Sequence, residues 1–287
     1  MGWFKAKIDL ANIAELKNDL LAKPEAILGE LGKELKQQEF CVRWSVLKEV
    51  LPLLDRNQQR ALVRETLSAD ISALQALLDN YREREQAIEC LGYLPSREVV
   101  QTLANLLGHK DDAVQLMAAG ALQNHTPRLV VPVLIEGLLQ GKVAVARAGE
   151  VLLKMGFYAQ EMLMEAYKEA SPSVKAVIIE LIVLGDNPKC LPFVQEALEA
   201  KEAFLKKKAL EAVEAFGFRE LWTEVVMCLA EDDWSLRARA IEVLAKLQVT
   251  EALEFVEPFK NDADSWVRQC AIRYLESIQD SAGGRRV

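Results

Sequence analysis

Apolar positions recur through most of this 287-residue chain in a nine-residue pattern close to VRxxAIxxL. The clear copies are VRWSVLKEV from Val42, VQLMAAGAL from Val114, VKAVIIELI from Val174, LKKKALEAV from Leu205, LRARAIEVL from Leu236 and VRQCAIRYL from Val267, with degenerate copies from Glu83 and Ala144. After a first gap of 41 residues, successive copies begin 30 or 31 residues apart. A period of this length is typical of helical repeats that stack into a solenoid.

The last complete repeat, Thr250 to Ile278, shows the elements expected in each unit. Thr250 can cap a first helix, and the polar turn that contains Asp262 and Asp264 can cap a second. The apolar residues of the second helix follow an i, i+4, i+7, i+8, i+11 spacing on one helix face: Val267, Ala271, Tyr274, Leu275 and Ile278. The fifth motif position is usually Ala, which lets neighbouring helices approach closely. The pattern therefore predicts an all-α fold of about eight helix pairs.

The two ends of the chain depart from the repeat pattern. Residues 1–41 are expected to form N-terminal capping helices, the second opening at Pro24, because a solenoid needs a polar outer end. The repeat array is expected to span 42–280, with an additional helix from Asp55 inside the longer first gap. Residues 281–287 have little apolar surface to bury and are expected to be a disordered tail.

Paired helices with an Asp-rich turn before VRxxAxxxL resemble HEAT repeats, and the thirty-residue period is similar to the HEAT-like variety of the phycobilin lyase (PBS lyase) type. The resemblance implies a right-handed α-α superhelix, in which the turn Asp and the Arg at motif position two form a ladder between adjacent units. The residues at position two that keep or approximate this ladder are Arg43, Arg84, Arg237, Arg268, Lys175 and Lys206. Gln115 and Val145 depart from it.

The charge balance narrows the classes of partner. The chain has 43 Asp and Glu against 35 Lys and Arg, a net charge of −8, and its densest cationic cluster is Lys206 to Lys208. Nucleic-acid affinity requires cations that neutralise phosphates, so nucleic acid is not an expected partner. No apolar run approaches about 18 residues, and charge comes too early for a signal peptide. We expect a cytoplasmic protein with no membrane insertion.

Signals for catalysis, metals or cofactors are nearly absent from the sequence. The five cysteines form no CxxC pair and are expected to be small buried apolar residues. His109 and His125 lack a second His or Cys at metal-ligand spacing, and neither is followed by the Glu that HEAT-type di-iron hydroxylases would require. No phosphate-binding or nucleophile motif occurs. We expect no cofactor and no enzymatic activity.

Motif position seven gives a candidate binding surface. It reads Lys48, Glu89, Gly120, Glu150, Glu180, Glu211, Glu242 and Arg273. In HEAT-type stacks the second helices line the concave face, so the four consecutive Glu residues would form an acidic stripe there. The alternative is that these are ordinary exposed helix residues, three of them paired with a cation three residues earlier.

Apolar residues near the middle of the array are further candidates for partner contact. Leu116, Met117, Val177 and Leu184 lie beside the acidic column, and Trp44 occupies position three of the first copy. Trp234 and Trp266 lie at the turns before the last two copies. Exposed apolar clusters and aromatic anchors mark interfaces. The same residues could instead pack against the next repeat.

Together these features favour a non-enzymatic protein-binding scaffold or adaptor that uses the concave face, with a basic or amphipathic helix as the partner. The alternative is a phycobilin lyase-like enzyme subunit or a chromophore-binding chaperone, which the resemblance of the repeats implies. Tetrapyrrole contacts are not part of the repeat pattern, so the sequence leaves this alternative open.

Overall fold

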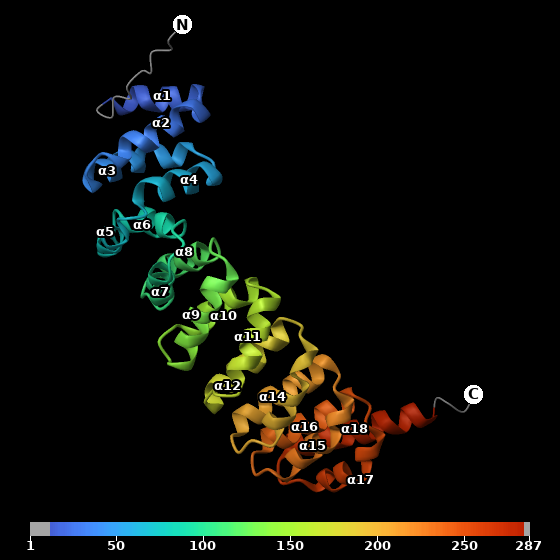
Figure 1. Cartoon of the computed structure of the whole chain (residues 1–287). Coiled ribbons are helices and arrows are strands. Elements are labelled where there is room, and N and C mark those ends of the chain that lie inside the picture. The colour runs from blue at the N-terminus through green and yellow to red at the C-terminus, as the bar shows by residue number, and fades with distance from the viewer. Residues whose placement is uncertain (1–11, 284–287) are drawn as a thin grey trace. The chain divides into compact units, whose positions relative to one another are not determined.

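The computed structural model describes residues 12–283, and this range contains helices and turns but no β-strand. Eighteen α-helices follow one another as pairs (Figure 1). The chain divides into two compact units, the first made of residues up to 137 with 141–154, the second of 138–140 with the residues from 155 onward. The sequence pattern predicts one continuous array, and it carries no break at this point.

In the first unit the odd-numbered helices open each pair and the even-numbered helices close it. The opening helices are α1 (Ile13–Ala22), α3 (Phe40–Val50), α5 (Ile71–Ala76), α7 (Arg97–Leu106) and α9 (Pro127–Leu139). The closing helices are α2 (Pro24–Lys36), α4 (Arg56–Leu67), α6 (Arg84–Leu91), α8 (Asp112–Leu122) and α10 (Val145–Lys154). We call the closing helices second helices, and they pack on one another as α2 on α4, α6 on α8, and α8 on α10.

The second unit repeats this arrangement. Its first helices are α11 (Phe157–Tyr167), α13 (Leu191–Leu198), α15 (Trp222–Met227) and α17 (Leu253–Val256). Its second helices are α12 (Pro172–Leu184), α14 (Ala203–Phe216), α16 (Trp234–Lys246) and α18 (Ser265–Gly283), each of which packs on the next. Helix pairs that stack one upon the next are the architecture of an α-solenoid, as the sequence predicts.

The apolar positions of the motif form the core of both units. Every Ala at motif position five is fully buried: Ala87, Ala118, Ala148, Ala209, Ala240 and Ala271. A single methyl group at this position allows neighbouring second helices to approach closely, while the larger apolar residues of the motif fill the space on either side. Ile178, the larger residue at this position in α12, is buried as well, so the position belongs to the core whether its side chain is small or large.

The motif copy from Val42 lies on α3, which is the first helix of its pair. The second helix of that pair is α4, the helix expected from Asp55 and capped by that residue, whose side chain accepts the Asn57 and Gln58 N–H groups. Helix α4 packs on α2, the position that a second helix occupies in the other repeats. The longer first gap therefore reflects a change of helix within the pair and not an extra helix.

The residues at motif position two make two kinds of contact. In α16 the guanidinium of Arg237 binds both carboxylate oxygens of Asp262, at 2.8 and 2.9 Å, and so links one repeat to the turn of the next. It also donates to the carbonyl of Glu231 in its own turn, six residues back. Lys206 pairs with Glu231 in the same way, and Arg43 pairs with Asp70. These pairs are the ladder that the resemblance implies.

Gln115 departs from the Arg of the ladder but preserves half of its role. Its amide N–H donates to the His109 carbonyl, six residues back, at 2.6 Å. Its amide oxygen accepts from Arg147 of α10 at 3.1 Å, which connects α8 to the next second helix. The array therefore stays connected at this repeat without an ion pair.

The ends of the described chain are helical. Helices α1 and α2 occupy the region expected for the N-terminal cap, and α2 begins at Pro24 as expected. Helix α18 continues to Gly283, three residues into the segment expected as a disordered tail. Residues 1–11 and 284–287 lie outside the described range.

Candidate functional site

Positions four, seven and eleven of the motif lie on one side of each second helix, because these spacings return to the same face of an α-helix. We call this surface the second-helix face. In the first unit it carries Glu89 and Tyr93 on or just after α6, Met117, Gly120 and Asn124 on or just after α8, and Arg147, Glu150 and Lys154 on α10. In the second unit it carries Val177, Glu180 and Leu184 on α12, Lys208 and Glu211 on α14, and Arg239, Glu242 and Lys246 on α16.

The acidic column of the second unit is interleaved with cations. Lys208 lies between Glu180 of α12, at 3.3 Å, and Glu211 of its own helix, at 2.9 Å. Its hydrogen bond with Glu211 raises the pKa of Lys208, and the bond with Glu180 acts in the same direction. Glu180, which has no cation three residues earlier in its own helix, thus finds one on the next helix. The carboxylate side chains are about half exposed and Lys208 about one third, so the surface still presents its acids outward.

A second cation bridges the next pair of helices. Arg239 of α16 contacts Glu214 of α14 and Glu242 of its own helix, the latter at 3.5 Å. Lys246 also reaches Glu214, at 3.4 Å. The acidic stripe is therefore a network of charge pairs, which include the pairs three residues apart that the alternative interpretation predicts. In the first unit Glu150 is likewise paired, with Arg147 at 3.0 Å.

The apolar candidates on this face differ in exposure. Leu116 and Leu184 are 55% and 63% exposed, so their side chains are open to a partner. Val177 and Met117 are half-buried. Leu116 and Met117 belong to the first unit, and Val177 and Leu184 to the second.

Trp44 corrects the sequence-based expectation of an exposed anchor. It is 5% exposed, stacks on Phe40 and donates its indole N–H to Glu83 at 2.7 Å, a carboxylate that also pairs with Lys48. These bonds lower the pKa of Glu83. Trp44 therefore joins α3 to the segment before α6 and is not a contact surface. Trp234 and Trp266 are 48% and 46% exposed.

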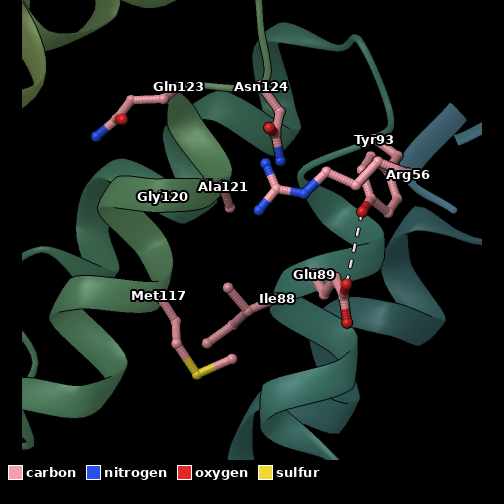
Figure 2. A pocket seen from close by; sticks show the side chains of 9 residues that line it. All are labelled: Arg56, Ile88, Glu89, Tyr93, Met117, Gly120, Ala121, Gln123 and Asn124. Carbon is pink, nitrogen blue, oxygen red and sulfur yellow. Dashed lines mark hydrogen bonds between the residues drawn. The ribbon is translucent and has the colours of Figure 1, made fainter. Parts of the chain in front are cut away.

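One part of the second-helix face is hollow. A cleft of about 590 Å³ lies among α4, α6 and α8 (Figure 2). Arg56 reaches from α4 toward Asn124 at one end of the cleft, and Ile88 and Met117 project toward each other at the other end. Gly120 also lines the cleft, and a Cβ built at this residue would meet no atom within 4 Å. The volume is within the range of natural ligand sites.

Two packing features fix the helices that border the cleft. Gly92, at the end of α6, allows the close approach of Ala121 on α8, because a Cβ at Gly92 would lie 3.0 Å from the Ala121 methyl group. Tyr93 is buried and donates to Gln59 of α4 at 2.7 Å, with Glu89 3.5 Å away. Burial raises the pKa of Tyr93 and the Glu89 carboxylate raises it further, while Arg56 lowers it.

The sequence gives one signal for this cleft. Position seven is Gly in one copy of the motif, at Gly120. In all the remaining copies it is Glu or a cation. The rest of the cleft could not be predicted, because Arg56 comes from α4, outside the motif copies. Sequence reasoning therefore included Met117 as a candidate but missed Arg56, Tyr93 and Asn124.

The histidines and cysteines lie mainly in structural positions. His109 accepts the Asp111 N–H in a turn, and His125 is buried, so that desolvation, reinforced by Arg64 and Arg60, lowers its pKa to about 4. Four cysteines are buried as expected, but Cys41 is exposed on α3. Within residues 12–283 no cluster of acidic, His and Cys side chains has a metal-binding arrangement. The helices of the same range are too short or too polar to cross a bilayer.

Comparison with known proteins identifies the class of this solenoid. HEAT repeats match residues 71–153 and 223–283, which together make up just over half of the sequence. The chain belongs to the HEAT repeat family. Comparison with curated proteins gives no significant match.

Comparison with solved structures finds matches of low similarity. An engineered protein is 18% identical, with 94% of each chain covered and a TM-score of 0.39. Human deoxyhypusine hydroxylase in complex with glycerol is 14% identical, with 93% of this chain and 99% of that chain covered and a TM-score of 0.36.

Proposed function

We propose that this chain is a protein-binding scaffold without catalytic activity, and that the second-helix face of the second unit holds an amphipathic partner helix with a basic edge. From the sequence, we expect the second helices to line the concave face. The observation that carries the proposal is Leu184, which is 63% exposed on the same side of α12 as the half-exposed Glu180 and the half-buried Val177. An apolar strip beside a carboxylate suits a helix whose apolar face is edged by Lys or Arg.

The energetics of the charge pairs are compatible with partner exchange. The pair between Glu180 and Lys208 joins side chains that are 51% and 32% exposed, and pairs of this exposure contribute about 0–1 kcal/mol. A partner cation can therefore replace Lys208 at Glu180 for little cost. Burial of Leu184 would supply about 1.5–3 kcal/mol, so the apolar contact provides affinity and the acids provide orientation.

Affinity capture with two matched double variants tests this proposal. The first carries Glu180→Lys and Leu184→Asp on the second-helix face. The control carries Glu165→Lys and Met227→Asp on first helices of the same unit, where both residues are more exposed than their counterparts, at 71% and 70%. We expect a protein that the unmodified chain and the control retain and that the first variant loses. Equal retention by both variants would contradict the proposed surface.

A further inference from the structure

The cleft among α4, α6 and α8 combines an apolar floor with polar groups at one end. Its floor is made by the buried Ile88 and the half-buried Met117. At the opposite end are Arg56, on the first turn of α4, and Asn124, just after α8 (Figure 2). This is the composition of a site for a small apolar group that carries a polar head.

Among the described residues, the polar side chains at this end of the cleft accept or donate no hydrogen bond, although the Arg56 charge acts on the Tyr93 hydroxyl. Among the described residues the Arg56 guanidinium forms no ion pair or hydrogen bond, and the side-chain amides of Asn124 and Gln123 form none either. Other arginines of the repeats are tied to carboxylates or carbonyls, as Arg237 is. A guanidinium matches the geometry of a carboxylate, which it can bind with two parallel hydrogen bonds, and the Asn124 amide lies beside it (Figure 2).

The absence of a side chain at Gly120 makes the space. In the neighbouring copies position seven is Glu89 and Glu150. The cleft is open because this copy has Gly where the neighbouring copies have Glu. A Glu side chain at this position would extend into the cleft, and its negative charge would repel an anionic ligand. The Glu89 carboxylate faces the cleft beside the Tyr93 hydroxyl, so the site presents one anion as well as one cation.

We infer that this cleft binds the carboxylate of a small apolar acid, with the carboxylate on Arg56 and Asn124 and the apolar side chain over Ile88 and Met117. Two sources supply this chemistry: the C-terminal residue of a polypeptide, or a free apolar amino acid whose ammonium group would meet Glu89. The inference goes beyond the protein-binding surface of the second unit and does not depend on it.

NMR titration of the full chain labelled with ¹³C-methyl methionine tests the site. The Met117 methyl signal is assigned by its loss in Met117→Leu, and N-acetyl-leucine is the probe. We expect a saturable shift of this signal, with a dissociation constant of about 1 mM for a contact of this size. N-acetyl-leucinamide, which has the same side chain and no charge, should bind about tenfold more weakly.

Two variants and a control locate the site. Arg56→Gln should weaken N-acetyl-leucine about tenfold, and Gly120→Glu should abolish the shift while leaving the rest of the methionine spectrum unchanged. Arg128→Gln, an exposed arginine of α9, should have no effect. If free leucine binds more tightly than N-acetyl-leucine, the site is assigned to free amino acids. If free leucine binds equally or more weakly, the site is assigned to the C-terminal residue of a polypeptide. The inference is overturned if no saturable shift occurs, if the amide binds as well as the acid, or if Gly120→Glu retains binding.

Discussion

Single side chains carry the connection between neighbouring repeats. The Arg237 guanidinium satisfies both oxygens of Asp262 and two turn carbonyls, with side chains that are 13% and 8% exposed. These bonds lower the pKa of Asp262 and raise that of Arg237. A partly buried, bidentate pair of this kind depends on the planar guanidinium, which a lysine ammonium does not reproduce.

We therefore expect Arg237→Lys to lower the free energy of unfolding by about 2 kcal/mol and Arg237→Ala by about 3–5 kcal/mol, since the alanine variant leaves Asp262 without its cation. Urea denaturation followed by circular dichroism measures both. Arg219→Lys is the control, because its pair with Glu251 is about half exposed on both sides and should contribute little. An Arg237→Lys variant as stable as this control would contradict the account.

His125 makes stability depend on pH. Its pKa is about 4 in the folded protein and about 6.5 in an unfolded chain, so the unfolded state binds more protons between these values. Stability contributed by neutral His125 is complete above pH 6.5 and declines as pH falls toward 4. From pH 7.5 to 5.0 the loss from this residue should be about 2 kcal/mol. His125→Leu should reduce the difference in the free energy of unfolding between pH 7.5 and 5.0 by this amount. An unchanged difference would show that another group causes the pH dependence.

Cys41 is the one cysteine that differs from the expectation of burial. Four thiols are buried, and burial raises the pKa of Cys190, Cys228 and Cys270 to about 11, which suppresses the reactive thiolate. A disulfide reagent should therefore label one thiol per native chain and five after unfolding. Cys41→Ser should remove the native reaction. Fast labelling of more than one thiol would mean that the repeats open readily.

At the scale of helices, two glycines with opposite surroundings control the approach of α6 and α8. Gly120 has free space where a Cβ would stand, whereas a Cβ at Gly92 would lie only 3.0–3.1 Å from the Ala121 methyl group and backbone. Gly120→Ala should raise the free energy of unfolding by about 0.5–1 kcal/mol, because Ala favours a helix. Gly92→Ala should lower it by about 1–3 kcal/mol through overpacking. Denaturant unfolding compares the two, and the same sign of effect at both glycines would contradict the packing described.

The sequence predicts which segments are helical better than how they pair. The copy at Val42 was expected on a second helix, because both helices of a repeat use similar apolar spacings and the motif alone does not distinguish them. The distinction comes from packing, since α4 contacts α2 as second helices do. Trp44 shows the same limit: its aromatic side chain predicts either an anchor or a core residue, and the bond to Glu83, 39 residues away, decides it.

The sequence also predicts only part of the candidate surface, because some of its contacts depend on how the helices pack. Pairs within one helix, such as Lys208 with Glu211, follow directly from a spacing of three residues. The pair between Glu180 and Lys208 depends on the register of α12 against α14, which the sequence does not encode locally. The cleft depends on three helices, and only the missing side chain at Gly120 marked it.

At the scale of the whole molecule, the net charge of −8 favours protein partners over nucleic acid. On α14 and α16 the cations Lys208, Arg239 and Lys246 of the second-helix face are engaged with carboxylates, so few remain for phosphates. We predict no binding to duplex DNA or RNA beyond weak association at physiological salt. Fluorescence anisotropy at 150 mM salt measures this, and salt-sensitive binding at micromolar concentration or tighter would contradict it.

HEAT repeats make two compact units in this chain, and the proposed partner surface lies within the second. A repeat array places equivalent side chains of successive second helices side by side, which gives an elongated partner segment several contacts of modest strength. The proposal therefore places the partner on the second-helix face of the second unit and not on its first helices.

Site-specific photo-crosslinking tests this claim most directly. A photoreactive phenylalanine analogue replaces Leu184 on the second-helix face, and in a matched protein it replaces Met227, the more exposed apolar residue on α15. After irradiation in extract of the cells that express the protein, mass spectrometry identifies the crosslinked chains. We expect one protein to be crosslinked through position 184 and not through 227, and Glu180→Lys to remove the crosslink. The same protein crosslinked through 227, or no protein crosslinked through 184, would contradict it.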